Sequence, residues 1–270
     1  GMITAATDTD GIALAQARGG LYALLANAWR YPERDVLSAL FDLADRFGRS
    51  SIFRKLDDAT ASALDGVLDG IQVLGRGKRS PLDPNRDRYV ALFGHAVRGT
   101  CPLYELEYGQ SEIIQQASEL ADIAGFYCAF GLESAGAGAD RPDHLAVECE
   151  FLSVLCTKEA AGLEVDLPAL AETCFDAQRA FLRDHLAQWL PAFCTRVMSA
   201  DGDGLYGRLA RLAAAMVEEE CRRFEIAAGP QYLELRAVDP NADANINCDG
   251  SAGEDRLVPL TMNGSEVAGA

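Results

Sequence analysis

The residues with the clearest chemical potential lie in one short stretch, residues 141–152. Projected at about 100° per residue, its apolar side chains form one helix face, and Glu148 falls within that face. His144 stands one helical turn earlier, at the edge of the same face. Because a carboxylate turned toward a core is costly unless it is paired, Glu148 needs a partner. We expect it to be mostly buried and to contact His144 or a tyrosine from residues 104–108.

A histidine and a glutamate at this spacing allow three interpretations. They can be a satisfied structural pair in a helical core, part of a binding site, or two ligands of a metal or catalytic centre. A metal centre requires at least a third ligand, and the Glu-x-x-His motif of di-iron bundles is absent. A metal-dependent enzyme centred on His144 and Glu148 is therefore the alternative function.

Sequence signatures of common enzymes are missing elsewhere. The chain has no Gly-x-Ser-x-Gly, no Gly-Lys-Ser/Thr loop and no His-Glu-x-x-His. It has three histidines in all, and His95 and His185 are isolated, which predicts surface or packing roles for them. These absences favour a binding protein with no catalytic residues, no cofactor and no metal.

The net charge limits the class of partner. Acidic residues number 41 against 24 basic ones, which gives a formal charge of −17. Such a surface repels phosphate backbones, so we expect no nucleic-acid partner. It would attract a basic peptide, although the same charge could serve only solubility.

Eight cysteines are spread along the chain without a Cys-x-x-Cys pair. Several fall among apolar residues of helical pattern, where a free cysteine acts as a small hydrophobic residue. Zinc ligands would normally stand two to four residues apart. We expect all eight thiols to be reduced, as in a cytosolic domain.

The location expected from the sequence is the cytoplasm. No apolar run approaches the ~20 residues that span a bilayer, so we expect no stable membrane insertion. The first residues lack the basic and apolar regions of a secretory signal.

Periodicity predicts an all-α protein, a single-domain helical bundle of about nine helices. No convincing alternation of period two occurs before residue 230. Residues 1–235 form the predicted helical domain, and residues 236–270 form an irregular tail whose composition indicates disorder. The predicted helices cover residues 12–30, 33–47, 56–74, 86–93, 112–130, 143–161, 168–186, 191–198 and 205–226.

Two segments resemble the TorD/DmsD/NarJ-like chaperones, also called redox-enzyme maturation proteins, and the first runs from residues 87–94 on into residues 101–108. Residues 87–94 (Asp-Arg-Tyr-Val-Ala-Leu-Phe-Gly) and 101–108 (Cys-Pro-Leu-Tyr-Glu-Leu-Glu-Tyr) resemble that family's helix end and the Pro-Tyr-Glu-Ser-x-Tyr-type loop that follows it. Residues 141–148 (Arg-Pro-Asp-His-Leu-Ala-Val-Glu) resemble its Pro-x-Asp-His helix start. Their order and helical setting also agree, so the resemblance spans roughly residues 20–230.

The chain departs from the family pattern in detail. Leu103 is inserted before Tyr104, Leu106 replaces the usual serine, and Pro142 directly precedes Asp143. The Cys-Pro-Leu-Tyr-Glu form is similar to chaperones of the type II dimethyl-sulfoxide-reductase branch. Residues 236–270 lie outside the resemblance.

The resemblance implies an all-α monomer or homodimer that binds the precursor of a molybdenum-enzyme catalytic subunit. The bound part would be its twin-arginine leader peptide or another segment of the apo-enzyme, held in the cytoplasm until the cofactor is inserted and before export. By the same resemblance, the peptide-binding residues would be Tyr104, Glu105, Tyr108, Asp143, His144 and Glu148. An acidic, partly aromatic loop beside a buried His–Glu helix also suits two arginines followed by an apolar stretch.

Overall fold

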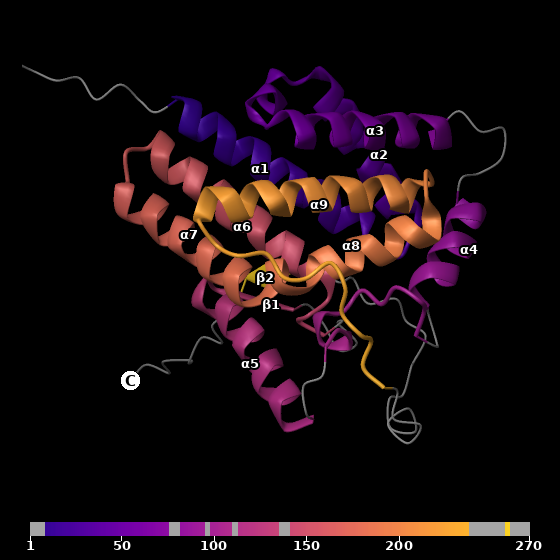
Figure 1. The fold of residues 1–270 in the computed structure, drawn as a ribbon. Coiled ribbons are helices and arrows are strands. Elements are labelled where there is room, and N and C mark those ends of the chain that lie inside the picture. The colour runs from indigo at the N-terminus through magenta and orange to yellow at the C-terminus, as the bar shows by residue number, and fades with distance from the viewer. Residues whose placement is uncertain are drawn as a thin grey trace, which may run out of the picture.

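The computed structural model describes residues 9–75, 82–94, 98–109, 113–134, 141–237 and 257–259, and within them the chain is a bundle of α-helices (Figure 1). These ranges hold nine α-helices, which confirms the predicted all-α fold. None of them is long and apolar enough to cross a bilayer. The helices are α1 (Thr9–Ala28), α2 (Arg34–Arg49), α3 (Asp58–Gly75), α4 (Leu82–Phe93), α5 (Ile113–Ala129), α6 (Leu145–Glu164), α7 (Pro168–Phe181), α8 (Ala187–Asp201) and α9 (Leu205–Phe224).

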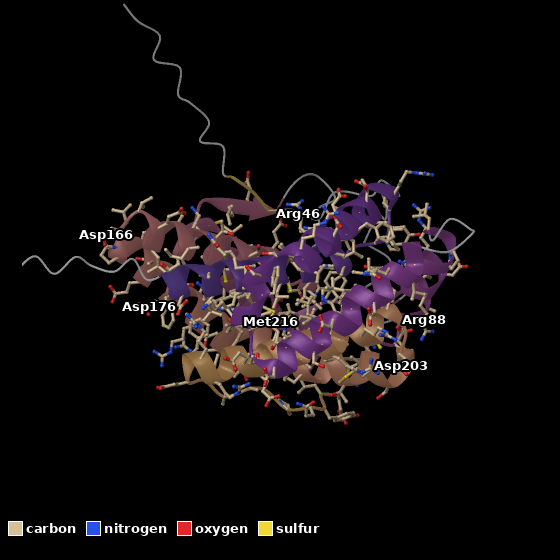
Figure 2. All side chains as sticks on the ribbon, turned by 90° about the horizontal axis from the view of Figure 1, so that it is seen from above. Arg46, Arg88, Asp166, Asp176, Asp203 and Met216 are labelled. Atoms are coloured by element: carbon tan, nitrogen blue, oxygen red, sulfur yellow. The ribbon has the colours of Figure 1, made fainter. Side chains whose placement is uncertain are left out.

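Two pairings organise the bundle. Helix α1 packs along α6 over most of its length, and α9 lies between α3 and α8 (Figure 1). Where these layers meet, Trp29 contacts Phe93 and Phe193 edge-to-face, with ring centroids 6.0 and 5.2 Å apart. In the view from above, charged side chains such as Arg46 and Asp176 lie outside, whereas Met216 lies among the helices (Figure 2). The apolar stripes read from the sequence therefore do face one core.

The junction between α7 and α8 differs from the prediction of a break before Pro191. A π-helical turn, Leu182–Leu186, joins the two helices without a loop, and Pro191 lies inside α8. A proline has no N–H for the carbonyl four residues earlier. Here that carbonyl, of Ala187, accepts a hydrogen bond from Gly229 N at 2.8 Å instead. The helix continues because a distant segment replaces the missing donor.

That segment, residues 225–237, has little regular secondary structure and runs alongside α8. A Cβ on Gly229 would overlap the backbone of Gln188, so only glycine permits the approach. Further along, Gly109 N donates to Glu234 O and Arg236 N donates to Glu107 O, both at 2.9 Å. The segment thereby fastens the loop of residues 101–109 to the bundle.

One short ladder was not predicted. Strand β1 (Leu132–Ser134), which follows α5, pairs antiparallel with β2 (Leu257–Pro259) from the predicted tail. These three residues are the part of the predicted tail that the structure describes, and they form a strand. Strand pairing joins residues far apart in sequence, and three residues are too few to give a period-two signal.

The described cysteines are mostly core residues. Seven cysteines are free, and all of them are buried except Cys128. Burial raises the pKa of the Cys156 thiol to about 12. Cys248 and His95 lie outside the described residues.

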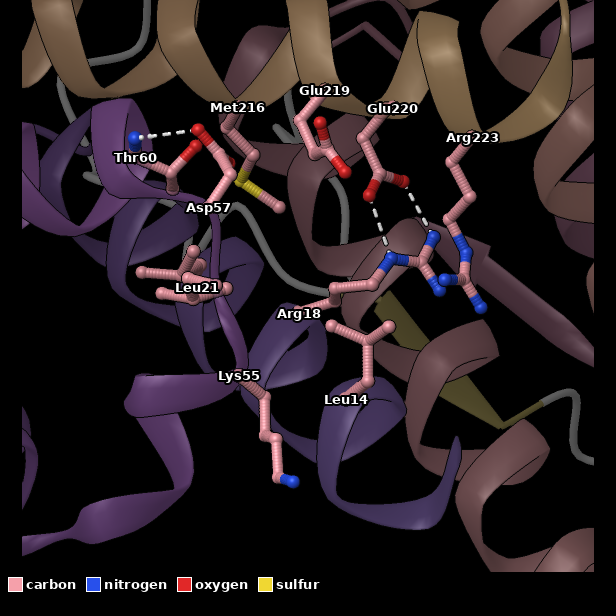
Figure 3. A pocket seen from close by; sticks show the side chains of 11 residues that line it. Leu14, Arg18, Leu21, Lys55, Asp57, Thr60, Met216, Glu219, Glu220 and Arg223 are labelled. Atoms are coloured by element: carbon pink, nitrogen blue, oxygen red, sulfur yellow. Dashed lines mark hydrogen bonds and ion pairs between the residues drawn. The ribbon is translucent and has the colours of Figure 1, made fainter. Parts of the chain in front are cut away.

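A buried ionic cluster ties four helices together at the middle of α1, and Figure 3 shows its pair of Arg18 and Glu220. The guanidinium of Arg18 donates to Glu220 at 2.6 Å, to Glu159 at 3.2 Å and to Gln178 at 2.6 Å. It borders a cavity of about 50 Å³ that Leu21, Met216 and other side chains line. Each charge in the cluster has an opposite partner, as burial requires.

Candidate functional site

The loop of residues 101–109 and the start of α6 form one backbone unit. Leu145 N donates to Leu103 O at 2.8 Å, and Glu105 N donates to Asp143 O at 3.0 Å. Tyr104 and His144 form an antiparallel bridge between these bonds. The two segments that carry the candidate residues, far apart in sequence, are therefore side by side in the fold.

Asp143 holds this unit together from within. Its side chain is fully buried, and its carboxylate accepts hydrogen bonds from Leu106 N at 3.1 Å and from Arg141 Nε and Nη2 at 3.0 and 2.6 Å. The guanidinium of Arg141 also lies over the Tyr104 ring, 5.0 Å from its centroid. With its lone pairs used in this way, Asp143 stabilises the loop.

His144 is the N-cap of α6. Its Nδ1 accepts a hydrogen bond from Ala146 N at 3.1 Å, and the ring packs edge-to-face on Tyr104 at 4.9 Å. Only 2% of the residue is exposed. Asp143, the residue before this cap, is turned to the loop instead.

Glu148 is fully buried, as its helical phase predicted. Its partners are different from those expected. Trp189 Nε1 of α8 donates to Glu148 Oε2 at 3.3 Å, and the Glu105 carboxyl lies in hydrogen-bonding contact with it. The expected loop does supply a partner, but a glutamate rather than a tyrosine. The imidazole of His144 is turned toward the first turn of α6, so its Nδ1 is used there.

Glu105 continues this contact toward the surface. Its Oε1 lies 3.2 Å from His185 Nδ1, and His185 Nε2 lies 3.1 Å from Asp122 Oδ2. His185 stands in the π-helical turn and is 3% exposed, whereas the Asp122 side chain is 65% exposed. A chain of polar groups thus runs from Asp122 to Trp189, and we call it the Asp122–Trp189 chain.

Sequence reasoning missed the importance of His185. It treated this histidine as a surface or packing residue, because no spacing links it to residues 105, 122 or 148. The available signal was helical phase, because His185 stands four residues after Phe181 and four before Trp189, on the same apolar stripe. A buried histidine in such a stretch requires polar partners on both ring nitrogens.

The pKa values along the Asp122–Trp189 chain favour bound protons. Burial raises the pKa of Glu148 well above its ordinary value, and the charges of Glu105 and Asp143 raise it further. Burial also raises the pKa of Glu105, against the opposing effect of His185. Burial alone would lower the pKa of His185, but the hydrogen bonds and charges of Glu105 and Asp122 outweigh it, and the pKa is raised.

Accessibility divides the six predicted site residues into two groups. Tyr104 and Glu105 are partly exposed. The buried group consists of Tyr108, Asp143, His144 and Glu148. The hydroxyl of Tyr108 donates a hydrogen bond to Pro102 O at 2.9 Å.

An open groove lies next to Glu105. Its volume is about 510 Å³, and it runs between α5 and the π-helical turn. Its acidic lining is Glu119, Asp122 and Asp184, with His185 at its base beside Glu105. Within the described ranges, no group of three or more His, Cys, Asp or Glu side chains is arranged to hold a metal ion. The metal-centre interpretation therefore gains no third ligand there, and the groove instead suits a cationic side chain.

The chain is similar in sequence to several known proteins. The profile of a family described as nitrate reductase delta subunit matches residues 54–195, just over half of the chain. The chain is 26% identical over 208 residues to the perchlorate reductase assembly chaperone protein of Dechloromonas aromatica (strain RCB), a match that covers 75% of this chain and 87% of that protein. It is 32% identical over 153 residues to the selenate reductase assembly chaperone protein of Thauera selenatis, covering 55% and 74%.

A shorter match reaches chaperone protein TorD of Vibrio cholerae serotype O1 (strain ATCC 39315 / El Tor Inaba N16961). Identity there is 36% over 78 residues, 29% of this chain and 34% of that protein. The chain thus matches about one third of the length of these TorD relatives. The names of the relatives are those of chaperones, which agrees with the prediction of a chaperone rather than an enzyme.

Proposed function

Because the chain belongs to the nitrate reductase delta subunit family, we propose that it is a cytoplasmic assembly chaperone for a molybdenum-containing reductase and has no catalytic activity of its own. Its partner is the precursor of the catalytic subunit, and it binds that precursor before cofactor insertion and export. Relatives named as perchlorate, selenate and chlorate reductase assembly chaperone proteins support this class of partner.

We assign the bound segment to the twin-arginine leader of that subunit. The observation that carries this assignment is the position of Glu105, an acidic side chain that is 14% exposed and that pairs with His185, one of the residues lining an acidic groove. A guanidinium reaching the groove would meet Glu105 and Asp122, and the ring of Tyr104 lies on the same loop. The buried residues Asp143 and His144 keep this loop in position from beneath.

Charge also favours this partner. The net charge of −17 raises the local concentration of a basic peptide and speeds its association. A charge-assisted hydrogen bond contributes roughly 1.5–3 kcal/mol, so losing one weakens binding about 10- to 100-fold.

Calorimetric titration with a synthetic leader peptide, two adjacent arginines followed by an apolar stretch, tests the proposal. We expect Glu105→Gln to weaken binding about 10-fold or more. Asp203→Asn, an exposed carboxylate that pairs with Arg211 away from the groove, should leave the affinity unchanged. Equal affinity of both variants would place the peptide elsewhere, and absence of binding by the wild type would contradict the leader as the bound segment.

A further inference from the structure

The geometry of the Asp122–Trp189 chain determines how many protons its polar groups hold. Each of its hydrogen bonds needs one donor and one acceptor. The indole of Trp189 can only donate, so Glu148 Oε2 accepts from it. Glu148 Oε1 and Glu105 Oε2 are both buried, and no donor in the described part of the chain reaches either one. Since the two carboxyls are in hydrogen-bonding contact, a single shared proton satisfies both oxygens.

His185 carries the second proton. Both of its ring nitrogens face carboxylate oxygens, Nδ1 toward Glu105 and Nε2 toward Asp122. A carboxylate offers only acceptors, so both nitrogens must donate, and the ring is then an imidazolium. The Phe126 and Phe181 rings cover it, at 5.6 and 5.2 Å between ring centroids.

The other charged groups nearby are already paired. Asp143 is neutralised by Arg141, and Asp184, next to His185 in the π-helical turn, is paired with Arg183. Glu119 lines the groove on the α5 side and adds negative charge. The imidazolium is therefore the cation that directly balances Glu105.

We infer that the protein binds a client arginine by exchanging it for the proton on His185. A guanidinium that reaches Glu105 through the groove replaces the imidazolium as counter-ion, and His185 releases about one proton to solvent. The proton between Glu105 and Glu148 stays in place, so the pair keeps a single negative charge for the arginine. This inference rests on the proposed binding of an arginine-containing segment.

The exchange sets the direction of the pH dependence. Below the raised pKa of His185, protons compete with the arginine, so affinity increases as pH rises, by up to about 10-fold per pH unit. Above that pKa the proton is already lost, and affinity no longer changes with pH. Removing the imidazole should remove the dependence.

Calorimetric titration of the full chain with the leader peptide, in phosphate and in Tris at pH 7, measures the released protons from the difference in apparent enthalpy. We expect about one proton for the wild type and for Asp203→Asn, and close to none for His185→Gln. Equal apparent enthalpies for the wild type in the two buffers would overturn the exchange.

The charge of His185 in the free protein is tested separately, by ¹⁵N imidazole resonances assigned with His185→Gln. Two protonated ring nitrogens at pH 7 support the proton count, and a neutral ring at that pH overturns it. If the leader does not bind, the proposed function and the exchange are both overturned. If it binds with equal apparent enthalpies in the two buffers, only the exchange is overturned. The resonances test the charge of His185 in either case.

Discussion

The carboxyl groups of Glu105 and Glu148 meet inside the protein, one from a surface loop and the other from the buried face of α6. Two carboxylates cannot both ionise at such close range, so one proton is held between them. This contact adds to the backbone hydrogen bonds that join the loop to the start of α6, and it exists only while the proton is bound.

We predict that Glu148→Gln makes stability less dependent on pH. The pKa of Glu148 in the folded protein is raised above its value in the unfolded chain. Its stabilising contribution to the folded state is therefore present at low pH, and it is lost as pH rises from about 4.5 through the pKa of the folded protein. Glutamine is neutral at every pH, and its amide can donate to Glu105. We expect the free energy of unfolding of the variant, relative to that of the wild type, to increase by roughly 1–2 kcal/mol between pH 5.5 and 8.5. Thermal unfolding across this range measures the difference.

Glu218→Gln is the matched control, since Glu218 is exposed on α9. It should follow the wild type across the whole pH range. Parallel curves for all three proteins would show that the proton is not held where we place it.

The burial of Glu148 could be predicted from sequence, and its partners could not. Burial depends on helical phase within one element, which the pattern of apolar residues fixes locally. The partners Glu105 and Trp189 come from a loop and from another helix, and only the folded chain brings them together. His185 was underestimated for the same reason, because its two carboxylates lie on separate elements.

We predict that Asp143→Ala lowers stability. The variant leaves Leu106 N without its acceptor and removes both hydrogen bonds from Arg141. Each unsatisfied buried donor costs about 1–3 kcal/mol, so we expect a loss of about 2–4 kcal/mol in urea unfolding. Asp45→Ala, which breaks an exposed pair with Arg49, should change stability within measurement error. Similar results for the two variants would contradict a structural role of Asp143.

Pro191 and Gly229 show a second limit of sequence reasoning. A proline in a helical pattern predicts a break, because the carbonyl four residues earlier loses its donor. Here a backbone N–H from the 225–237 segment supplies that donor to Ala187. Nothing near Pro191 in sequence indicates this, so the predicted helix of residues 191–198 started too late.

We predict that Gly229→Ala detaches the 225–237 segment from α8. Its Cβ would overlap backbone atoms of Gln188, which cannot move without distorting the helix. Overpacking of this kind costs typically about 1–3 kcal/mol. The loss should also speed hydrogen exchange at Gly109 N, whose bond to Glu234 O depends on the same segment. Urea unfolding and hydrogen exchange measure the two effects.

Gly125→Ala is the control for a glycine without such a neighbour. It lies inside α5, and a Cβ there meets nothing within 4 Å. It should raise stability by about 0.5–1 kcal/mol through helix propensity. Stabilisation by both substitutions would mean that Gly229 has no packing role.

We predict that Arg18→Met lowers stability, because Arg18 is the central cation of the buried ionic cluster. Arg18→Met keeps an apolar stem of similar length but leaves the buried carboxylate of Glu220 without its cation and Glu159 with only its longer contact to Arg223, at 3.8 Å. Breaking a buried pair in this way typically costs about 3–5 kcal/mol. Lowering the pH should restore part of the loss, because protonation removes the unpaired charge. Arg46→Met, at an exposed position on α2, should be close to neutral in the same urea titration. An Arg18→Met protein as stable as Arg46→Met, with no gain on acidification, would show that the cluster does not hold α1 to α6 and α9.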